Sequence, residues 1–91
     1  MRANDPDRVL RAVGRRVAEL RVATGLTQEL LAEKLSVSAK YVQQVESGSQ
    51  NLSLRSLVRI ADAVGAQVIA LLEPPKSLRA PTGRPKGRAG R

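Results

Sequence analysis

The side chains of this sequence that are suited to chemistry are hydrogen-bonding groups on one face of a predicted helix. They recur three or four positions apart and include no acid: Lys40, Gln43, Gln44 and Ser47, with Ala39 at the exposed N-terminal end. The opposite face carries Val42 and Val45. Glutamine can make two hydrogen bonds to adenine, lysine can donate to guanine, and alanine can contact the methyl group of thymine. A polar face that only contacts solvent is the alternative interpretation.

Catalysis and metal binding find few of the residue types they need. The 91 residues include no Cys and no His, so the commonest metal ligands and the usual general base are missing. We therefore expect no enzymatic activity, no metal site and no cofactor. Hydrophobic residues make up 42% of the chain and Tyr41 is its one aromatic residue, which suits one small domain with an aliphatic core.

Two short helices joined by a tight turn are expected to position the polar face. Thr27 is a good N-cap for the first helix, which has about nine residues. Its apolar residues are Leu30, Leu31 and Leu35. After the turn at residues 36–38, Ser38 caps the second helix, and Gly48 ends it. Two helices in this arrangement are how many proteins insert a helix into the DNA major groove.

Three further helices complete an expected all-α domain at residues 1–75. Pro6 begins the first helix and Gly25 ends it, while Ser53 and Gly65 bound the fourth. The apolar positions of the first helix are Val9, Val13, Val17 and Leu20, and those of the fourth are Leu54, Leu57, Ile60, Ala61 and Val64. A short fifth helix carries Val68, Ile69, Leu71 and Leu72 before Pro74. Gly14, inside the first helix, indicates a close packing contact.

The net charge of +8 is concentrated at the C-terminal end of the chain. All eight acidic residues and ten of the sixteen basic ones precede Pro74, which leaves +2 for that part and +6 for the remainder. Residues 76–91 lack an apolar period and are rich in Pro, Gly and Arg, so we expect a disordered basic tail. Neither a secretory signal in the first 21 residues nor a membrane span is apparent, and we expect a cytoplasmic protein that associates with the nucleoid.

From about Val13 to Glu73 the sequence resembles the phage-repressor and Cro-like helix-turn-helix family, also called the XRE family. The resemblance rests on the segments VGRRVAELRVATGLTQELLAEKLSVSAKYVQQVESG and LSLRSLVRIADAVGA, whose landmarks occur in order and at the spacing of the family. It implies a five-helix fold like that of lambda repressor and binding to duplex DNA.

The resemblance also implies roles for individual residues. Gln28 corresponds to a glutamine that contacts a DNA phosphate, and Ala39, Lys40 and Gln44, flanked by Gln43, correspond to base-reading positions. Further candidates for contacts with the DNA backbone are Thr27, Ser38, Tyr41, Ser47, Ser49, Gln50, Asn51 and Arg55, together with Arg15 and Arg16. Core packing is the alternative role for Tyr41, and a solvated charge is the alternative for each arginine.

Arg21 and Glu46 match an arginine and a glutamate that pair in some relatives, although two unrelated surface charges are the alternative. Two features depart from the family. Ser36 occupies a turn position that is commonly Gly, so a positive φ there would be strained. The loop at residues 49–51 is uncharged where several relatives have Lys or Arg, which predicts weaker and less salt-sensitive DNA binding by the domain.

The tail resembles in part an AT-hook, a short segment that lies in the DNA minor groove. Its candidate residues are Arg84, Lys86 and Arg88, and Thr82 stands where a basic residue is typical. A nonspecific electrostatic tether to DNA and a tail that only aids solubility are the alternatives.

We expect a homodimer, because one module contacts too few base pairs for specificity in a genome. The predicted interface is the C-terminal helix, with Val68, Ile69, Leu71 and Leu72; packing onto the first and fourth helices is the competing interpretation. The sequence thus predicts a dimeric transcriptional repressor. The alternative is an antitoxin or another protein-binding module in which DNA binding is secondary.

Overall fold

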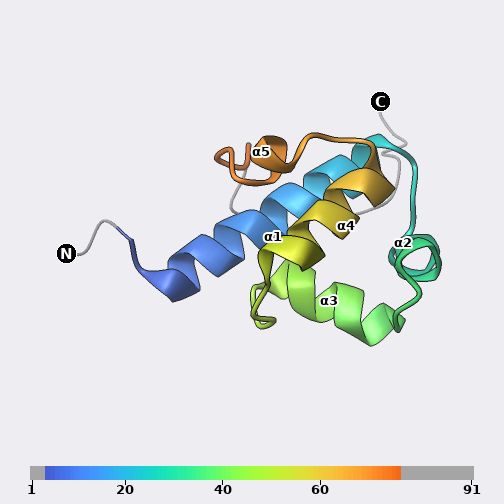
Figure 1. Ribbon diagram of the computed structural model, residues 1–91, viewed down its shortest axis with the longest axis horizontal. Helices are drawn as coiled ribbons and strands as arrows, with labels where there is room; N and C mark the ends of the chain where they lie inside the picture. The colour runs from blue at the N-terminus through green and yellow to red at the C-terminus, as the bar shows by residue number, and fades with distance from the viewer. Residues whose placement is uncertain (1–3, 77–91) are drawn as a thin grey trace, which may run out of the picture.

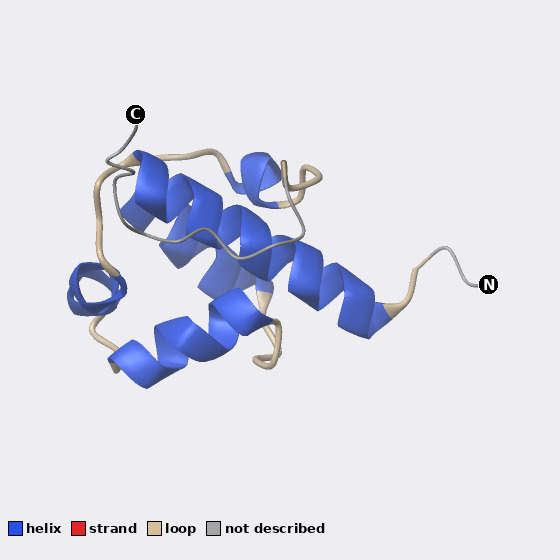
Figure 2. Cartoon of the chain, turned by 180° about the vertical axis from the view of Figure 1, so that it is seen from behind, coloured by secondary structure: helices blue, strands red, loops and turns tan. Residues whose placement is uncertain are grey.

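The computed structural model describes residues 4–76, in which five α-helices surround one aliphatic core. The helices are α1 (Pro6–Ala23), α2 (Gln28–Leu35), α3 (Ala39–Ser47), α4 (Leu54–Val64) and α5 (Val68–Leu71). Helix α1 crosses the molecule and contacts α3, α4 and α5, and α2 packs against α3 and α4 (Figure 1). Seen from behind, the described residues contain helices and loops and no strand (Figure 2).

Capping residues determine where the helices begin and end. The side chains of Thr27, Ser38 and Ser53 accept hydrogen bonds from backbone N–H groups in the first turns of α2, α3 and α4. Helix α2 ends at Ser36, whose φ of 59° makes it the one described residue other than glycine with a positive φ. The expected strain at this turn is therefore present.

The core is formed by Val and Leu side chains from every helix. The largest fully buried ones are Val17, Leu31, Val42, Val64 and Leu71. Gly14 is also buried. A Cβ atom added there would approach the carbonyl oxygens of Val45 and Glu46, the latter to 2.6 Å. The close contact predicted for Gly14 thus joins α1 to the backbone of α3.

Three residues expected on the apolar faces are exposed instead. Val9, Leu30 and Leu54 have exposed fractions of 45%, 45% and 75%. Val9 lies in the first turns of α1, which extend beyond the other helices (Figures 1 and 2), and Leu54 is the first residue of α4. Helical periodicity gives the direction of a side chain, but burial also requires another element opposite it.

Candidate nucleic-acid interface

Helix α3 presents the polar face that the sequence predicts. Its buried residues are Val42, Val45 and Glu46. On the other side Lys40, Gln43 and Ser47 are exposed, and Ala39 and Gln44 are half-buried. Within residues 4–76 the side chains of Lys40, Gln43 and Gln44 make no hydrogen bond or ion pair, so their donors and acceptors are available to a ligand.

A buried ion pair attaches α3 to α1. Arg21 Nε donates to Glu46 Oε2 at 2.6 Å, and Arg21 Nη2 donates to Glu46 Oε1 at 3.1 Å. The third donor, Nη1, bonds the carbonyl oxygen of Leu26 in the turn between α1 and α2, at 2.9 Å. Because the two side chains are almost fully buried, solvent screens this contact little. The structure confirms the pairing predicted for Arg21 and Glu46.

Gln28 belongs to the same network. Its Nε2 donates to Glu46 Oε1 at 3.0 Å, so the carboxylate joins the N-terminal end of α2 to α3 and α1. An amide nitrogen carries two hydrogens, and this bond occupies one of them. The second hydrogen remains available for a phosphate, which was the role predicted for Gln28.

Arg15 is bonded to the protein itself through one nitrogen of its guanidinium group, which leaves only the remaining donors for its candidate role at phosphate. Its Nη2 donates to the carbonyl oxygen of Glu46. This carbonyl lies in the last turn of α3, where helical carbonyls lack partners within the helix and the negative end of the helix dipole favours a cation. Arg15 therefore stabilises the C-terminal end of α3, a role that the spacing of the sequence did not indicate.

Arg16 likewise holds the fold together and does not extend freely into solvent. Its Nε donates to the carbonyl oxygen of Ala70 at 2.7 Å, and its guanidinium pairs with Glu19 at 3.4 Å and Glu73 at 3.0 Å. These contacts attach α5 to α1. Arg59 acts similarly on α2, where its Nη2 donates to the carbonyl oxygen of Leu35 at 2.5 Å.

The capping hydroxyls of α2 and α3 keep their donor capacity. Thr27 Oγ1 accepts from the N–H of Leu30, and Ser38 Oγ accepts from the N–H of Tyr41, both at 3.0 Å. A hydroxyl that accepts a hydrogen bond still has its own proton to donate. Both residues can therefore cap a helix and bind a phosphate oxygen at the same time.

The loop after α3 uses its hydroxyls within the protein. Ser47 Oγ and Ser49 Oγ both donate to the carbonyl oxygen of Gln44, at 3.1 and 3.3 Å, and lie 3.0 Å from each other. Gln50 Nε2 makes a long bond of 3.5 Å to the carbonyl oxygen of Asn51. A phosphate contact from Ser47 or Ser49 would have to replace one of these bonds.

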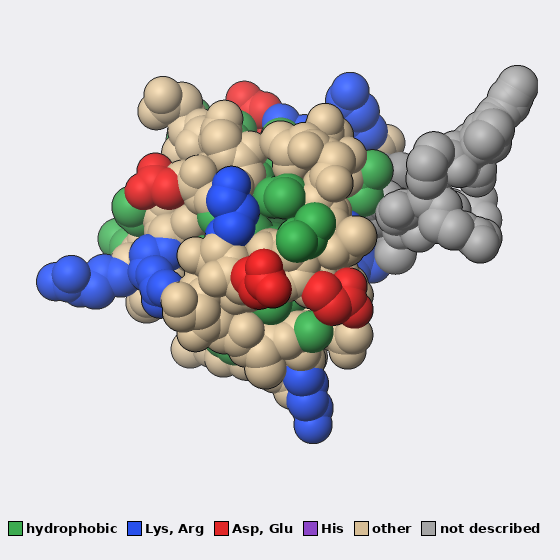
Figure 3. All heavy atoms as spheres, turned by 90° about the vertical axis from the view of Figure 1, so that its right-hand side faces the viewer, with side chains coloured by type: hydrophobic (Ala, Val, Ile, Leu, Met, Phe, Trp, Pro, Cys, Tyr) green, Lys and Arg blue, Asp and Glu red, His purple; other side chains and the backbone are tan. Residues whose placement is uncertain are grey.

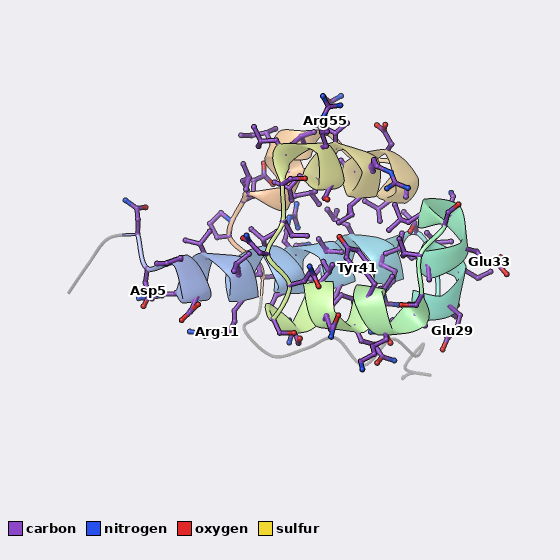
Figure 4. All side chains as sticks on the ribbon, turned by 60° about the horizontal axis from the view of Figure 1, so that its bottom comes forward. Asp5, Arg11, Glu29, Glu33, Tyr41 and Arg55 are labelled. Atoms are coloured by element: carbon purple, nitrogen blue, oxygen red, sulfur yellow. The ribbon has the colours of Figure 1, made fainter. Side chains whose placement is uncertain are left out.

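Tyr41 lies on α3, and Arg55 lies in the first turn of α4. Tyr41 is half-buried and packs against the core, as its core-packing interpretation predicts. In Figure 4 Tyr41 lies between α3 and α4, and Arg55 projects from α4 at the outer edge of the molecule. Arg55 is exposed and forms no ion pair within residues 4–76.

The exposed side of α2 carries acidic side chains, whereas the polar face of α3 carries none. Figure 3 views the side of the molecule that carries α2 and shows acidic side chains beside hydrophobic ones. The exposed residues of this helix include Glu29, Leu30 and Glu33. Carboxylates repel phosphates, so this side is unsuited to a contact with DNA.

One residue of the predicted dimer interface belongs to the core of the monomer. Leu71 is fully buried and Val68 packs partly against the core, whereas Ile69 and Leu72 have exposed fractions of 66% and 51%. The prediction was therefore wrong for Leu71, because α5 packs one side onto α1 and α4.

Arg84, Lys86 and Arg88, the candidate residues of the tail, lie outside the described residues. No helix among residues 4–76 is long and apolar enough to cross a membrane.

Residues 12–73 match a family model described as "Helix-turn-helix domain". The chain is 40% identical over 60 residues to the immunity repressor protein of Bacillus phage phi105, covering 66% of this chain and 42% of the repressor. It thus spans less than half of that relative's length. It is 31% identical over 61 residues to the control protein C.BamHI of Bacillus amyloliquefaciens, covering 66% of this chain and 75% of that protein.

Solved structures show the same arrangement of helices. The restriction-modification controller protein C.AhdI from Aeromonas hydrophila superposes with a TM-score of 0.70 at 37% identity, over 74% of this chain and 97% of that one. The clp gene regulator ClgR from C. glutamicum gives 0.69 at 31% identity, over 70% of this chain and 82% of that one. The chain therefore belongs to the helix-turn-helix family of transcriptional regulators, of the phage-repressor and Cro-like (XRE) type.

Proposed function

We propose that this chain is a homodimeric repressor that binds duplex DNA sequence-specifically, with α3 in the major groove. The observation that carries the proposal is the contrast between the two sides of α3. One side is attached to α1 and α2 through Glu46, while the side chains of Lys40, Gln43 and Gln44 have no partner among the described residues. A rigidly held helix with free hydrogen-bonding groups is what direct reading of base edges requires.

The proposed contacts divide into those that read bases and those that bind the backbone. Lys40 and Gln44 read bases, supported by Ala39 and Gln43. Gln28, Thr27 and Ser38 bind phosphates, because each retains a hydrogen to donate at the N-terminal end of α2 or α3, where the helix dipole favours an anion. Tyr41, Arg55 and the loop at residues 49–51 are proposed as further backbone contacts, and the basic residues of the tail as a nonspecific tether.

Repression and dimerisation are supported by different observations. Similarity to a phage immunity repressor supports repression, in which the bound protein occupies DNA needed by the transcription machinery. Ile69 and Leu72 supply exposed apolar area on α5 for a two-fold contact. Two copies of α3 would then read half-sites about 34 Å apart.

Selection of bound duplexes from random DNA tests the proposal directly. The wild-type chain is expected to enrich a two-fold symmetric site. Gln44→Ala should cost about 1–3 kcal/mol of binding free energy on that site and relax the preference at one base step. Gln28→Ala should weaken binding to all sequences similarly, since a phosphate contact carries no base information.

Gln67→Ala is the matched control for these variants. Gln67 is exposed, precedes α5 and makes no side-chain capping bond. It should leave both affinity and sequence preference unchanged. If random DNA yields no enriched sequence, sequence-specific binding is ruled out and the protein-binding alternative is favoured; if Gln44→Ala keeps the wild-type preference, the role of Gln44 is wrong.

A further inference from the structure

A basic groove between α1 and the end of α3 is not used by the contacts proposed above. It has a volume of about 420 Å³ and is lined by Arg8, Arg11, Ala12, Arg15 and Ser47. The three arginines are three and four residues apart, so they follow one side of α1. The groove is therefore walled by cations on α1 and closed by a serine of α3.

Arg8 and Arg11 differ from the other arginines of α1 in having no acceptor. Arg15, Arg16 and Arg21 each bond a protein oxygen. Both side chains are exposed, and within residues 4–76 neither Arg8 nor Arg11 makes a hydrogen bond or an ion pair. Their guanidinium groups are free to bind an anion, and a phosphate can take two parallel hydrogen bonds from each.

Close contacts hold the groove next to α3. A Cβ atom added to Gly48 would lie 2.7 Å from Arg11 Cγ and 2.8 Å from Arg11 Cα, so the residue that ends α3 packs directly on α1 at this position. Arg15 bonds the carbonyl oxygen of Glu46 on the same side. The stem of Arg11 and the end of α3 therefore keep a fixed relative position.

The groove continues the polar face of α3 toward one edge of the molecule. Ser47 belongs to both, as the last residue of the exposed side of α3 and as part of the lining. In Figure 4 Arg11 projects from α1 near the C-terminal end of α3, at the edge opposite Arg55. The first turns of α1, which carry Arg8, extend beyond the other helices (Figure 1).

We propose that this groove binds the phosphate backbone of DNA beside the segment that α3 contacts, an inference that rests on the function proposed above. Arg8 and Arg15 are about 10 Å apart along the helix axis, which is long enough to meet more than one phosphate of a strand. DNA lying against Lys40, Gln44 and Ser47 would pass the groove next. The groove supplies cations that the uncharged loop at residues 49–51 lacks.

The test uses Arg8→Gln, Arg11→Gln and the double variant in the full chain, on the duplex that random selection yields. Glutamine keeps Cβ and Cγ, so the packing of residue 11 against Gly48 is preserved. The slope of log K against log salt concentration should become less steep by about 0.9 for each lost phosphate contact. The double variant loses two contacts in each protomer of the proposed dimer, so the advantage of the wild type should shrink by roughly two orders of magnitude between 50 and 200 mM salt.

Lys34→Gln is the control, because it removes one positive charge elsewhere. Lys34 is exposed and lies at the end of α2 beside Arg59 and Asp62 of α4. Its salt slope should match the wild type. An equal loss of slope in Lys34→Gln would show that net charge matters and that the groove does not.

Neutral methylphosphonates placed one at a time along the duplex locate the contact. At flanking positions they should weaken the wild type several-fold and leave the double variant unaffected, since the partner of the phosphate is already gone. If the wild type binds its site and the double variant keeps the full salt slope, the groove does not bind DNA phosphates, and the proposed function remains intact. A wild-type protein that selects no DNA would instead overturn the proposed function.

Discussion

Arg21 and Glu46 are joined by two hydrogen bonds, of 2.6 and 3.1 Å, although 25 residues separate them in the sequence. Their exposed fractions are only 5% and 4%. A buried pair adds little net stability over apolar residues of the same size, but removal of one partner leaves a buried charge uncompensated. The pair also orients Gln28. The pair therefore links the position of α3 to the position of Gln28, a residue proposed to bind a DNA phosphate.

Glu46→Gln should lower the free energy of unfolding by about 3 kcal/mol, because Arg21 loses its counter-charge and an amide N–H would face a guanidinium N–H. Urea denaturation followed by circular dichroism measures the loss. Glu33→Gln, at an exposed position of α2, is the control and should change stability by less than about 0.5 kcal/mol. Equal stability of the two variants would show that the buried pair is not needed.

Gly14→Ala should destabilise the protein by about 1–3 kcal/mol, although alanine is the better helix former. The added Cβ would lie 2.6 Å from the carbonyl oxygen of Glu46, so α3 must move away from α1. Thermal unfolding measures the stability.

Gly65→Ala is the control for the effect of crowding. Its Cβ meets nothing within 4 Å, and only the positive φ of 72° opposes it, at a cost of about 1 kcal/mol. Affinity for the selected DNA should fall in Gly14→Ala and stay unchanged in Gly65→Ala. A Gly14→Ala protein that matches the wild type in both measurements would exclude close packing at this site.

The sequence predicted the helix boundaries well, because caps and glycines act locally. Thr27, Ser38 and Ser53 cap helices where expected, and Gly48 ends α3. Long-range relationships were harder to foresee. Nothing in the spacing of Arg15 shows that its guanidinium reaches the carbonyl oxygen of Glu46, 31 residues away. That contact depends on how closely α1 and α3 approach, which only the packed structure determines.

The same reasoning applies to the exposure and contacts of the residues of the candidate site. Exposure of Lys40 and Gln43 follows from burial of Val42 and Val45 on one helix, so periodicity is enough. Gln28 required the resemblance to a family, and its bond to Glu46 was not foreseen. That bond joins two helices through a side chain whose own partner, Arg21, lies on a third.

Ser36→Gly should stabilise the protein by about 0.5 kcal/mol. Glycine adopts the φ of 59° at this position without the steric cost that a side chain incurs, and part of the gain is lost to the greater freedom of glycine in the unfolded chain. The expected rise in Tm is roughly 2–4 °C. Ser36→Ala retains the strain and should give no rise, so an equal increase in both variants would point to another cause.

Leu71 and its neighbours on α5 separate packing within the monomer from contact between monomers. Leu71→Ala should destabilise the protein by about 2–5 kcal/mol, because this side chain is fully buried against α1 and α4. Ile69→Asp and Leu72→Asp replace exposed side chains and should leave unfolding nearly unchanged at low protein concentration. If α5 forms the proposed two-fold contact, analytical ultracentrifugation should show these two variants as monomers at concentrations where the wild type is dimeric. Their affinity for a single half-site should then equal that of the wild type, whereas binding to the full symmetric site should weaken. Wild-type dimerisation that survives both aspartates would place the interface on another surface.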